Sequence, residues 1–408
     1  MVSQALVGQR IRRLRHVSGL GQDDFAKRVG IASGSVSKLE NGRMSIPGDV
    51  LSGIGEVLGC TPNFLTSAVE LAPTTRPWLR AYADAPKRTV DQIVDDCTTA
   101  MEAIVGLDLK LLQDSIPHFT GDLMDQSAIE EFAMEVRVAA GLGEGDVVGN
   151  SIRAAERLGC VVLPMSDEVG RHIGLSVRAN RIGMICLGRL TSDGVPVPGD
   201  RQRWTVAHEL GHLALHMSQS APTSAEEASQ IEKQANAFAG AFLAPGDAML
   251  EALERLGGRV TLQTLARIKE HWGISIKALV TRFRSLGVID ADHARSLFKQ
   301  ISARGWNKKE PVPVGTEQAI WFIKAIEKAM RGTIDPVASA AHIVGLDRGH
   351  LDRWTNWSPP VPAELADVVT STFGERSTTT QAPRSKAAVV SMLSSHRSRT
   401  KMRPKPAT

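Results

Sequence analysis

Two histidines separated by three residues give the sequence its clearest chemical pattern, His208-Glu-Leu-Gly-His212. On an α-helix, residues four apart point to nearly the same side, so both imidazoles can bind one Zn²⁺ ion. Glu209 follows the first histidine directly and can take a proton from water at the metal. Gly211 leaves room for a second element to pack closely against this helix. The pattern therefore predicts a zinc centre with Glu209 as its general base.

A tetrahedral catalytic zinc site needs a third protein ligand, which must come from outside this motif. A histidine six residues after His212 is excluded, because Ser218 occupies that position. The next predicted helix, over residues 225–242, carries Glu232 beside its apolar stripe and among small residues. A carboxylate in such surroundings suits a metal ligand. The two glutamates at the start of this helix are better explained as surface acids that compensate the helix dipole.

The segments around these residues resemble the ImmA/IrrE-type metallopeptidases, and the resemblance extends over residues 125–311. The matching stretches are 159–164, 174–187, Arg203–His216, Glu232–Ala239, Leu243–Pro245, 262–286 and 305–311. The resemblance implies a zincin-like α+β domain with peptidase activity. Ala244 departs from the methionine that is usual before the proline, a change that concerns packing only.

The resemblance also implies roles for single residues. His208, His212 and Glu232 are expected to bind Zn²⁺, and Glu209 is expected to act as the general base. Asn236 lies one helical turn after Glu232 and is a candidate hydrogen-bond partner that orients a ligand. The group that would stabilise an oxyanion stays open among Arg201, Arg203 and His172. A buried polar cluster without metal is the alternative interpretation.

A second pattern lies near the N-terminus, where apolar residues at helical spacing predict five short helices over residues 1–66. Residues 22–30 are predicted as a helix with a glycine stop, followed by a turn and a second helix over 34–40. The segment resembles the Cro/XRE repressor family at Gln22, Ala26, Gly30, Val36, Ser37, Glu40 and Gly42. The resemblance implies a helix-turn-helix domain, placed at residues 1–68, that binds double-stranded operator DNA.

In that family the second helix enters the major groove. The residues expected to contact bases are Ser33, Ser35 and Lys38, and those expected to hold phosphates are Gln22, Ser37, Asn41 and Arg43. Gly21 stands where a threonine commonly caps the first helix, and residues 33–35 are small. Affinity is therefore expected to come largely from phosphates and DNA shape. A module for protein contact or dimerisation is the alternative.

The rest of the chain is predicted as mainly helical, which gives a mainly α protein with a small β-sheet. We expect a helical linker over residues 69–124, the peptidase domain over 125–311 and a C-terminal helical unit over 312–376. The unit is either a bundle packed on the peptidase or a second, weaker helix-turn-helix. Predicted helices cover 90–112, 128–140, 151–158, 204–216, 225–242 and 262–286, and predicted strands cover 174–177 and 182–187. Residues 377–408 cannot build a core and are predicted as a disordered basic tail.

Composition excludes several classes of protein. No stretch approaches the ~18 consecutive apolar residues of a membrane span, and the N-terminus lacks the apolar run of a secretory signal. The four cysteines form no CxxC pair, which favours reduced cytosolic thiols over a disulfide framework or a cysteine zinc site. The tail holds seven of the basic residues and no acid, and residues 1–66 hold eight basic against five acidic residues. Contact with DNA is therefore expected at the two ends of the chain.

These features predict a cytoplasmic, nucleoid-associated regulator in which a DNA-binding head is fused to a zinc metallopeptidase. The ImmA/IrrE resemblance implies cleavage of a repressor, in cis or in trans, in stress responses, mobile elements or toxin–antitoxin loci. A cut within the linker would separate the head, and the hairpin 174–187 offers an edge for an extended substrate. Two alternatives stay open, a transcription factor whose zinc domain senses a ligand and an antitoxin that binds a toxin. A homodimer is a further expected partnership.

Overall fold

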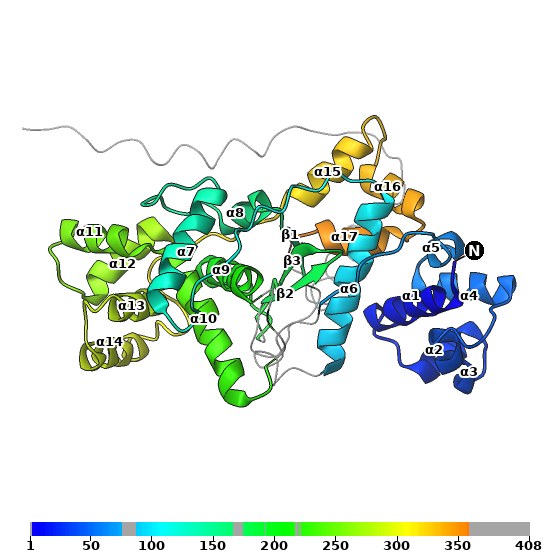
Figure 1. Ribbon diagram of the computed structural model, residues 1–408, viewed down its shortest axis with the longest axis horizontal. Helices are drawn as coiled ribbons and strands as arrows, with labels where there is room; N and C mark the ends of the chain where they lie inside the picture. The colour runs from blue at the N-terminus through cyan, green and yellow to red at the C-terminus, as the bar shows by residue number, and fades with distance from the viewer. Residues whose placement is uncertain are drawn as a thin grey trace, which may run out of the picture. The chain divides into compact units, whose positions relative to one another are not determined.

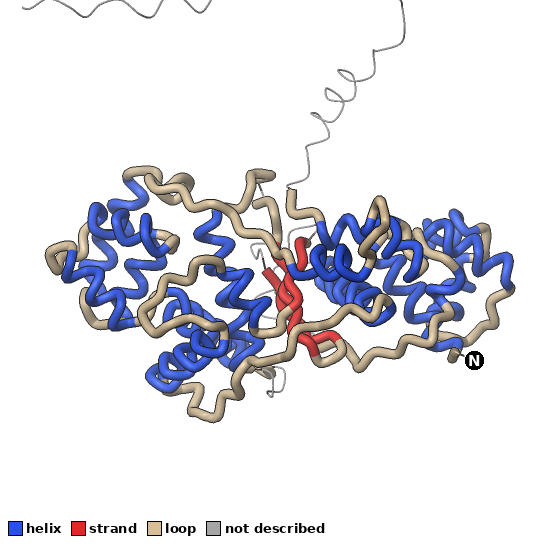
Figure 2. Tube along the Cα trace, turned by 90° about the horizontal axis from the view of Figure 1, so that it is seen from above, coloured by secondary structure: helices blue, strands red, loops and turns tan. Residues whose placement is uncertain are grey.

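A small three-stranded sheet lies among many helices in the computed structural model (Figure 1, Figure 2). The structure describes residues 2–75, 87–165, 174–191, 193–216, 219 and 222–358. The predicted basic tail, residues 377–408, lies outside them. The prediction of a mainly α protein with a small sheet is confirmed. Among the described residues, no helix has both the length and the apolar character that a membrane crossing requires.

The N-terminal domain consists of five helices, as the sequence predicted. They are α1 (Gln4–Val17), α2 (Gln22–Val29), α3 (Ser33–Glu40), α4 (Gly48–Leu58) and α5 (Pro62–Leu65). Gly30 adopts a φ of 78° and ends α2, so the chain can turn at once into α3. Gly21 provides no side-chain cap for α2. Helix α3 buries Val36 and Leu39, which leaves its opposite side exposed to solvent.

Helix α6 (Lys87–Gly106) connects this domain to the rest of the chain. The predicted helix over 90–112 was too long at its C-terminal end. Asp108 adopts a φ of 48°, and the N–H of Leu109 donates to the carbonyl of Ile104, which ends the helix. On its side facing α1, α6 carries Glu102, which accepts a 2.5 Å hydrogen bond from Nε of the buried Arg10. This buried ion pair fixes α1 against α6.

The sheet has the strand order β1-β3-β2, with β1 (Val161–Pro164) parallel and β2 (Gly174–Ala179) antiparallel to β3 (Ile182–Leu187). Asn180 and Arg181 both have positive φ, 48° and 67°, and form a two-residue turn between β2 and β3. The predicted strand over 174–177 was too short, because β2 reaches Ala179. Strand β2 lies at an edge of the sheet.

The two faces of the sheet belong to two different hydrophobic cores, because side chains alternate along each strand. Val162, Ile185 and Leu187 join the core that includes α7 (Gln126–Ala139), α8 (Ser151–Arg157), α9 (Gly199–Leu215) and α10 (Ala225–Leu243). Leu163 and Met184 join a core shared by the N-terminal domain, α6 and the C-terminal helices. The sheet therefore separates the two cores.

Four further helices follow α10. They are α11 (Gly246–Arg255), α12 (Leu262–Trp272), α13 (Ile276–Ser285) and α14 (Ala291–Ala303). The prediction of one helix over 262–286 was wrong, because Gly273 takes a φ of 65° and ends α12. Ser275 then caps α13 by accepting a hydrogen bond from the N–H of Ala278.

The C-terminal unit contains three helices, α15 (Trp321–Ala329), α16 (Pro336–Val344) and α17 (Arg348–Thr355). It packs on both the N-terminal domain and α6. The N–H of Thr61 donates to the carbonyl of Gly345 over 2.8 Å. The indole of Trp354 donates to Asp96 of α6 over 3.0 Å. Besides the expected packing on the peptidase domain, through the core shared with the sheet, the unit therefore packs on the N-terminal domain and α6.

Candidate metal centre

His208, His212 and Glu232 come together where α9 meets α10, with their ligand atoms within 4.8 Å of one another. The two Nε2 atoms are 3.1 Å apart. The carboxylate oxygens of Glu232 lie 3.4 Å from each of these nitrogens. Ligands 2.0–2.1 Å from a tetrahedral zinc ion are about 3.3–3.4 Å from one another. The three side chains therefore fit one face of a zinc coordination tetrahedron.

The local sequence explains this convergence. The four-residue spacing puts both histidines on the side of α9 that faces α10. Gly211 allows the two helices to approach, because a Cβ atom there would lie 3.0 Å from Cδ1 of Phe238 and 3.2 Å from the carbonyl of Ala235. Glu232 is half-buried, so the site is open to solvent on one side. The predicted close packing at Gly211 is present.

The pKa values of His208 and Glu232 depend on each other. Burial lowers the pKa of His208, but its hydrogen bond to Glu232 and the carboxylate of Glu209 outweigh burial and raise it. Burial raises the pKa of Glu232, but hydrogen bonds from His208 and His212 outweigh it and hold this pKa well below its usual range. A cation that binds here therefore competes with protons for the histidines.

Glu209 belongs to α9, and its side chain faces the edge strand β2. It is only 4% exposed, and its Oε2 accepts a 2.6 Å hydrogen bond from the hydroxyl of Ser176. Gly174 allows β2 to pass close by, because a Cβ atom there would lie 3.2 Å from Oε1 of Glu209 and 2.2 Å from Cγ2 of Thr205. Sequence reasoning missed Ser176, because its contact depends on how the strand registers against α9.

A buried chain of hydrogen bonds extends from His212 away from the ligand atoms. Nδ1 of His212 lies 3.1 Å from Nδ1 of His216, whose Nε2 lies 3.1 Å from Oε1 of Gln234. The amide nitrogen of Gln234 donates to the carbonyl of Leu123 over 3.0 Å. Burial and the neighbouring His212 lower the pKa of His216 to about 3, so His216 is neutral.

The end of this chain determines the tautomer of each ring. Since the Gln234 nitrogen donates to Leu123, the Gln234 oxygen must accept, and His216 carries its proton on Nε2. His216 then accepts at Nδ1 from His212. When His212 is neutral, as a metal ligand must be, this arrangement leaves its Nε2 with a lone pair on the side of Glu232.

Asn236 contacts a histidine ligand rather than the Glu232 carboxylate. Its side-chain amide donates to the backbone carbonyl of Glu232 over 2.8 Å and accepts from the indole of Trp204 over 3.2 Å. It also hydrogen-bonds His208, which helps to raise the pKa of that ring. Of the three candidate metal ligands, Asn236 therefore contacts the side chain of His208.

The three candidates for an oxyanion donor have different surroundings. Arg203 is buried and donates to Oε1 of Glu317 over 2.5 Å and to the carbonyl of Gly149 over 3.3 Å. This guanidinium is engaged in joining α9 to neighbouring segments. Arg201 lies on α9 and is exposed. His172 lies outside the described residues.

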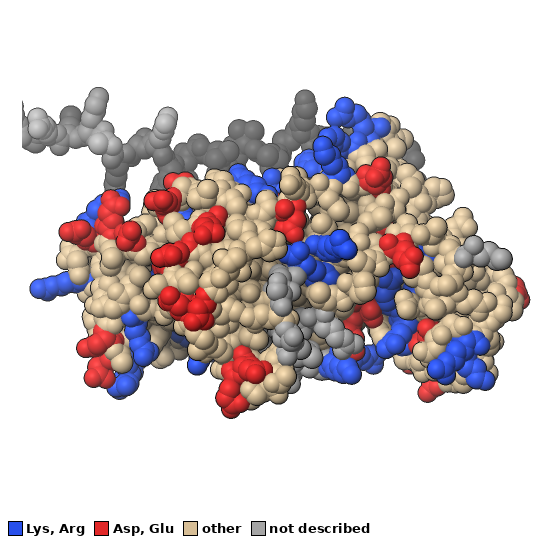
Figure 3. Space-filling view, in the orientation of Figure 1, with Lys and Arg blue, Asp and Glu red and all other residues tan. Residues whose placement is uncertain are grey.

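The residues predicted to contact DNA lie on α2, on α3 and just after α3. Ser35 is half-buried, and the exposed ones are Gln22, Ser33, Ser37, Lys38, Asn41 and Arg43. Lys and Arg side chains gather on the surface over α2 and α3 (Figure 3). A basic surface over the second helix of the motif suits contact with phosphates.

Some of these residues also brace the motif itself. Gln22 donates to Oε2 of Glu40 over 2.9 Å, and Asn41 donates to the carbonyl of Ser37 over 2.6 Å. Glu40 in turn accepts a 2.5 Å hydrogen bond from the buried Arg15. Because Glu40 ends α3, these bonds hold the helix in its orientation against α1 and α2.

Two family models match the chain. Residues 155–284 match the IrrE N-terminal-like domain, a peptidase family, and residues 6–64 match a helix-turn-helix domain. No curated protein matches the chain. The first match includes His208, His212, Glu232 and Glu209. The chain therefore joins a helix-turn-helix domain of a DNA-binding regulator to an IrrE N-terminal-like domain related to metallopeptidases, the fusion that the sequence predicted.

Proposed function

We propose that this protein is a transcriptional regulator whose second domain is a zinc-dependent endopeptidase that cuts a repressor-type protein. The tetrahedral spacing of His208, His212 and Glu232 beside the buried Glu209 carries the proposal. The helix-turn-helix domain supports DNA binding. The regulator would thus either bring its peptidase domain to a repressor at an operator or cleave a segment of its own chain.

His208, His212 and Glu232 would hold a zinc ion, which would supply a Lewis acid able to polarise a peptide carbonyl and to lower the pKa of water. Glu209 accepts the proton of the attacking water and passes it to the departing amine. Ser176 holds one oxygen of this carboxylate through its hydrogen bond, so the other oxygen stays available for proton transfer.

Strand β2 offers an edge on which an extended peptide can add as a further strand. The linker of this chain already pairs with it. The N–H of Thr75 donates to the carbonyl of Arg178 over 2.9 Å, and the N–H of Arg178 donates to the Thr75 hydroxyl over 2.8 Å. The N–H of Ala72 donates to Oδ1 of Asn180 over 3.2 Å. The linker therefore runs antiparallel to β2, toward Ser176.

This direction supports cleavage in cis. A peptide paired antiparallel to β2 beyond the position of Thr75 would approach the strand positions next to Glu209, where Ser176 and Gly174 lie. A tethered segment also has a high effective concentration at the site. We therefore infer that the linker after Thr75 is one substrate. An extended segment of a separate repressor would use the same edge in trans.

The test uses the full-length protein loaded with zinc, incubated with and without extract from stressed cells. We expect an N-terminal fragment that ends after Thr75 and before α6, identified by mass spectrometry. Glu209→Gln should keep the metal and form no fragment, because an amide cannot accept the proton. Glu226→Gln is the matched control, since Glu226 is exposed on α10. Equal cleavage by Glu209→Gln would refute the mechanism.

A second candidate function is a zinc-dependent sensor that changes DNA affinity with the chain intact. The core shared by the N-terminal domain, α6 and the sheet favours it, because a change near the metal could reach the head through packed side chains. In that case zinc removal would change operator affinity equally in the wild type and in Glu209→Gln, and no fragment would form.

A further inference from the structure

Two buried cysteines face each other between α6 and β3. The Sγ atoms of Cys97 and Cys186 are 2.9 Å apart, and the residues are 1% and 4% exposed. Both are free thiols. The S–S bond of a disulfide is about 2.03–2.05 Å long. The two sulfur atoms therefore need to approach by only about 0.9 Å to form one.

Cys97 lies on α6 and Cys186 lies on β3, and these two elements contact different parts of the protein. Helix α6 holds the N-terminal domain through Glu102 and the buried Arg10. Strand β3 is the central strand of the sheet and pairs with β2, whose Ser176 contacts Glu209. A bond between Cys97 and Cys186 would therefore join the helix that carries the DNA-binding head to the sheet beside the metal centre.

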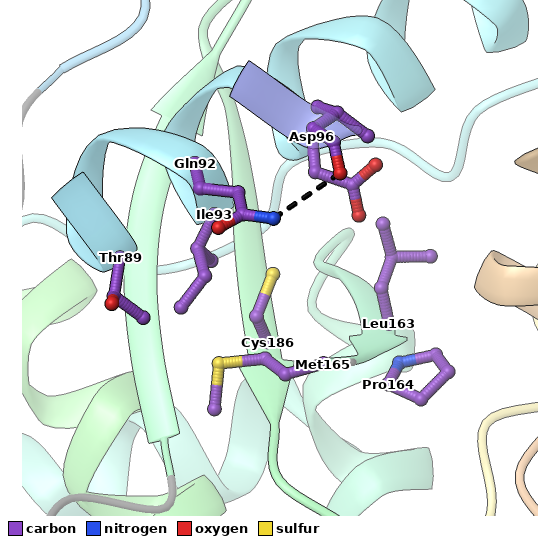
Figure 4. A pocket seen from close by; sticks show the side chains of 9 residues that line it. Thr89, Gln92, Ile93, Asp96, Leu163, Pro164, Met165 and Cys186 are labelled. Carbon is purple, nitrogen blue, oxygen red and sulfur yellow. Dashed lines mark hydrogen bonds between the residues drawn. The ribbon is translucent and has the colours of Figure 1, made fainter. Parts of the chain in front are cut away.

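The sulfur of Cys186 also borders a small pocket between α6 and the end of β1 (Figure 4). Ile93 and Asp96 of α6 line one side, and Pro164 and Met165 line the other. The pocket has room for about one water-sized molecule. A small oxidant can therefore approach Cys186 although the side chain is buried.

We propose that Cys97 and Cys186 are an oxidation-sensitive thiol pair that hydrogen peroxide, or another small hydroperoxide, converts into a disulfide between α6 and β3. In a reducing compartment such disulfides are transient and serve to sense oxidants. The proposal rests on the geometry of the two thiols and does not depend on peptidase activity.

The chemistry balances in two steps. The sulfur of Cys186 attacks one peroxide oxygen, so an S–O bond forms and the O–O bond breaks, and the thiol proton of Cys186 leaves with the departing hydroxide as water. The sulfur of Cys97 then attacks that of Cys186. An S–S bond forms, the S–O bond breaks, and the Cys97 proton leaves with the hydroxide as a second water. The two thiols lose two electrons and two protons, and the peroxide becomes two waters.

The hydrogen bond to Cys186 and burial raise the pKa of Cys97 well above its usual value. Cys97 therefore keeps its proton until the second step, and Cys186, which borders the pocket, reacts first. This order predicts that Cys97→Ser stops at a sulfenic acid on Cys186, whereas Cys186→Ser forms no oxidised product.

The experiment treats the full-length protein with hydrogen peroxide, blocks remaining thiols and maps peptides without reduction. We expect loss of two of the four thiols and one cross-linked peptide pair containing Cys97 and Cys186, restored by dithiothreitol. In Cys97→Ser, dimedone added together with denaturant after oxidation should label Cys186. Cys60→Ser and Cys160→Ser are the matched controls, since both cysteines are buried elsewhere, and each should still form the link.

Three outcomes would overturn the proposal. All four thiols could survive treatment that oxidises a low-molecular-weight thiol completely. Cross-links could be spread among all four cysteines, which would indicate unfolding. Cys186 could also be oxidised to a sulfinic acid without a link to Cys97. Mapping of the wild type alone distinguishes these results, so the conclusion does not depend on whether a variant folds.

Discussion

Ser176 on β2 donates a 2.6 Å hydrogen bond to Glu209 on α9. This contact joins the edge strand, where an extended substrate would pair, to the carboxylate that would move the proton. In the proposed mechanism, one hydroxyl group therefore links substrate binding to the general base.

Replacing Ser176 with alanine should slow cleavage about ten- to hundredfold, because a hydrogen bond to a charged group contributes about 1.5–3 kcal/mol. Zinc content should not change. The rate of fragment formation in the full-length protein measures the effect. Ser302→Ala, at an exposed position on α14, is the control. An unchanged rate in Ser176→Ala would show that the hydroxyl does not orient the base.

The wild type should bind about one equivalent of zinc, and Glu232→Ala should weaken binding. Loss of an outer hydrogen-bond partner already costs about 10–100-fold in metal affinity, so loss of a ligand should cost more. Competition with a chelating dye measures it. Glu226→Ala, on the same helix but exposed, should bind zinc normally. Unchanged zinc affinity in Glu232→Ala would show that another residue is the third ligand.

Binding of the full-length protein to operator DNA should weaken steeply with salt. Arg43→Ala should reduce the slope of log K against log salt concentration by about 0.9, because one phosphate contact is lost. Lys38→Ala should weaken binding to the operator more than to random DNA. Fluorescence anisotropy over a salt series measures both. Arg255→Ala, on α11, should change neither, and salt-independent binding would contradict phosphate contact.

Glu102→Ala should lower the free energy of unfolding by about 3–5 kcal/mol, because it leaves the buried Arg10 without its carboxylate partner. Glu251→Ala removes the partner of Arg255 in an exposed pair and should cost less than about 1 kcal/mol. Urea denaturation compares the two. Equal costs would mean that the α1–α6 contact does not depend on this ion pair.

His350 should make stability depend on pH. It is buried beside Arg353 and the carbonyl of Leu58, and burial followed by the Arg353 charge lowers its pKa. Below about pH 6.5 the unfolded chain therefore binds more protons than the folded one. As the pH decreases from this value, the free energy of unfolding decreases, until the pH is below the lowered pKa of the folded protein.

The difference between the wild type and His350→Gln isolates this contribution. Urea denaturation between pH 5 and 8 should show a smaller loss of stability at acid pH in the variant. His342→Gln, at an exposed position on α16, should follow the wild type. Parallel curves for all three proteins would contradict the prediction.

The sequence predicted the parts of the site that depend on local geometry. The spacing of His208 and His212 acts through a single helix, and the apolar stripe of α10 located Glu232. The contacts of Ser176 with Glu209 and of Gln234 with His216 depend on how separate elements register against each other, which leaves no local pattern. The end of α12 at Gly273 is also a local feature, but sequence reasoning missed it. The apolar spacing continues across Gly273 from α12 into α13, which suggested a single helix.

The core shared by the N-terminal domain, α6 and the sheet has a consequence for any cut in the linker. Such a cut breaks the backbone but leaves the Arg10–Glu102 pair and the buried apolar contacts in place. The two fragments would then behave as a heterodimer, and its dissociation would depend on the protein concentration and on the dissociation rate constant. The lifetime of that nicked complex, more than the rate of cleavage, would determine when the protein loses its function at the operator.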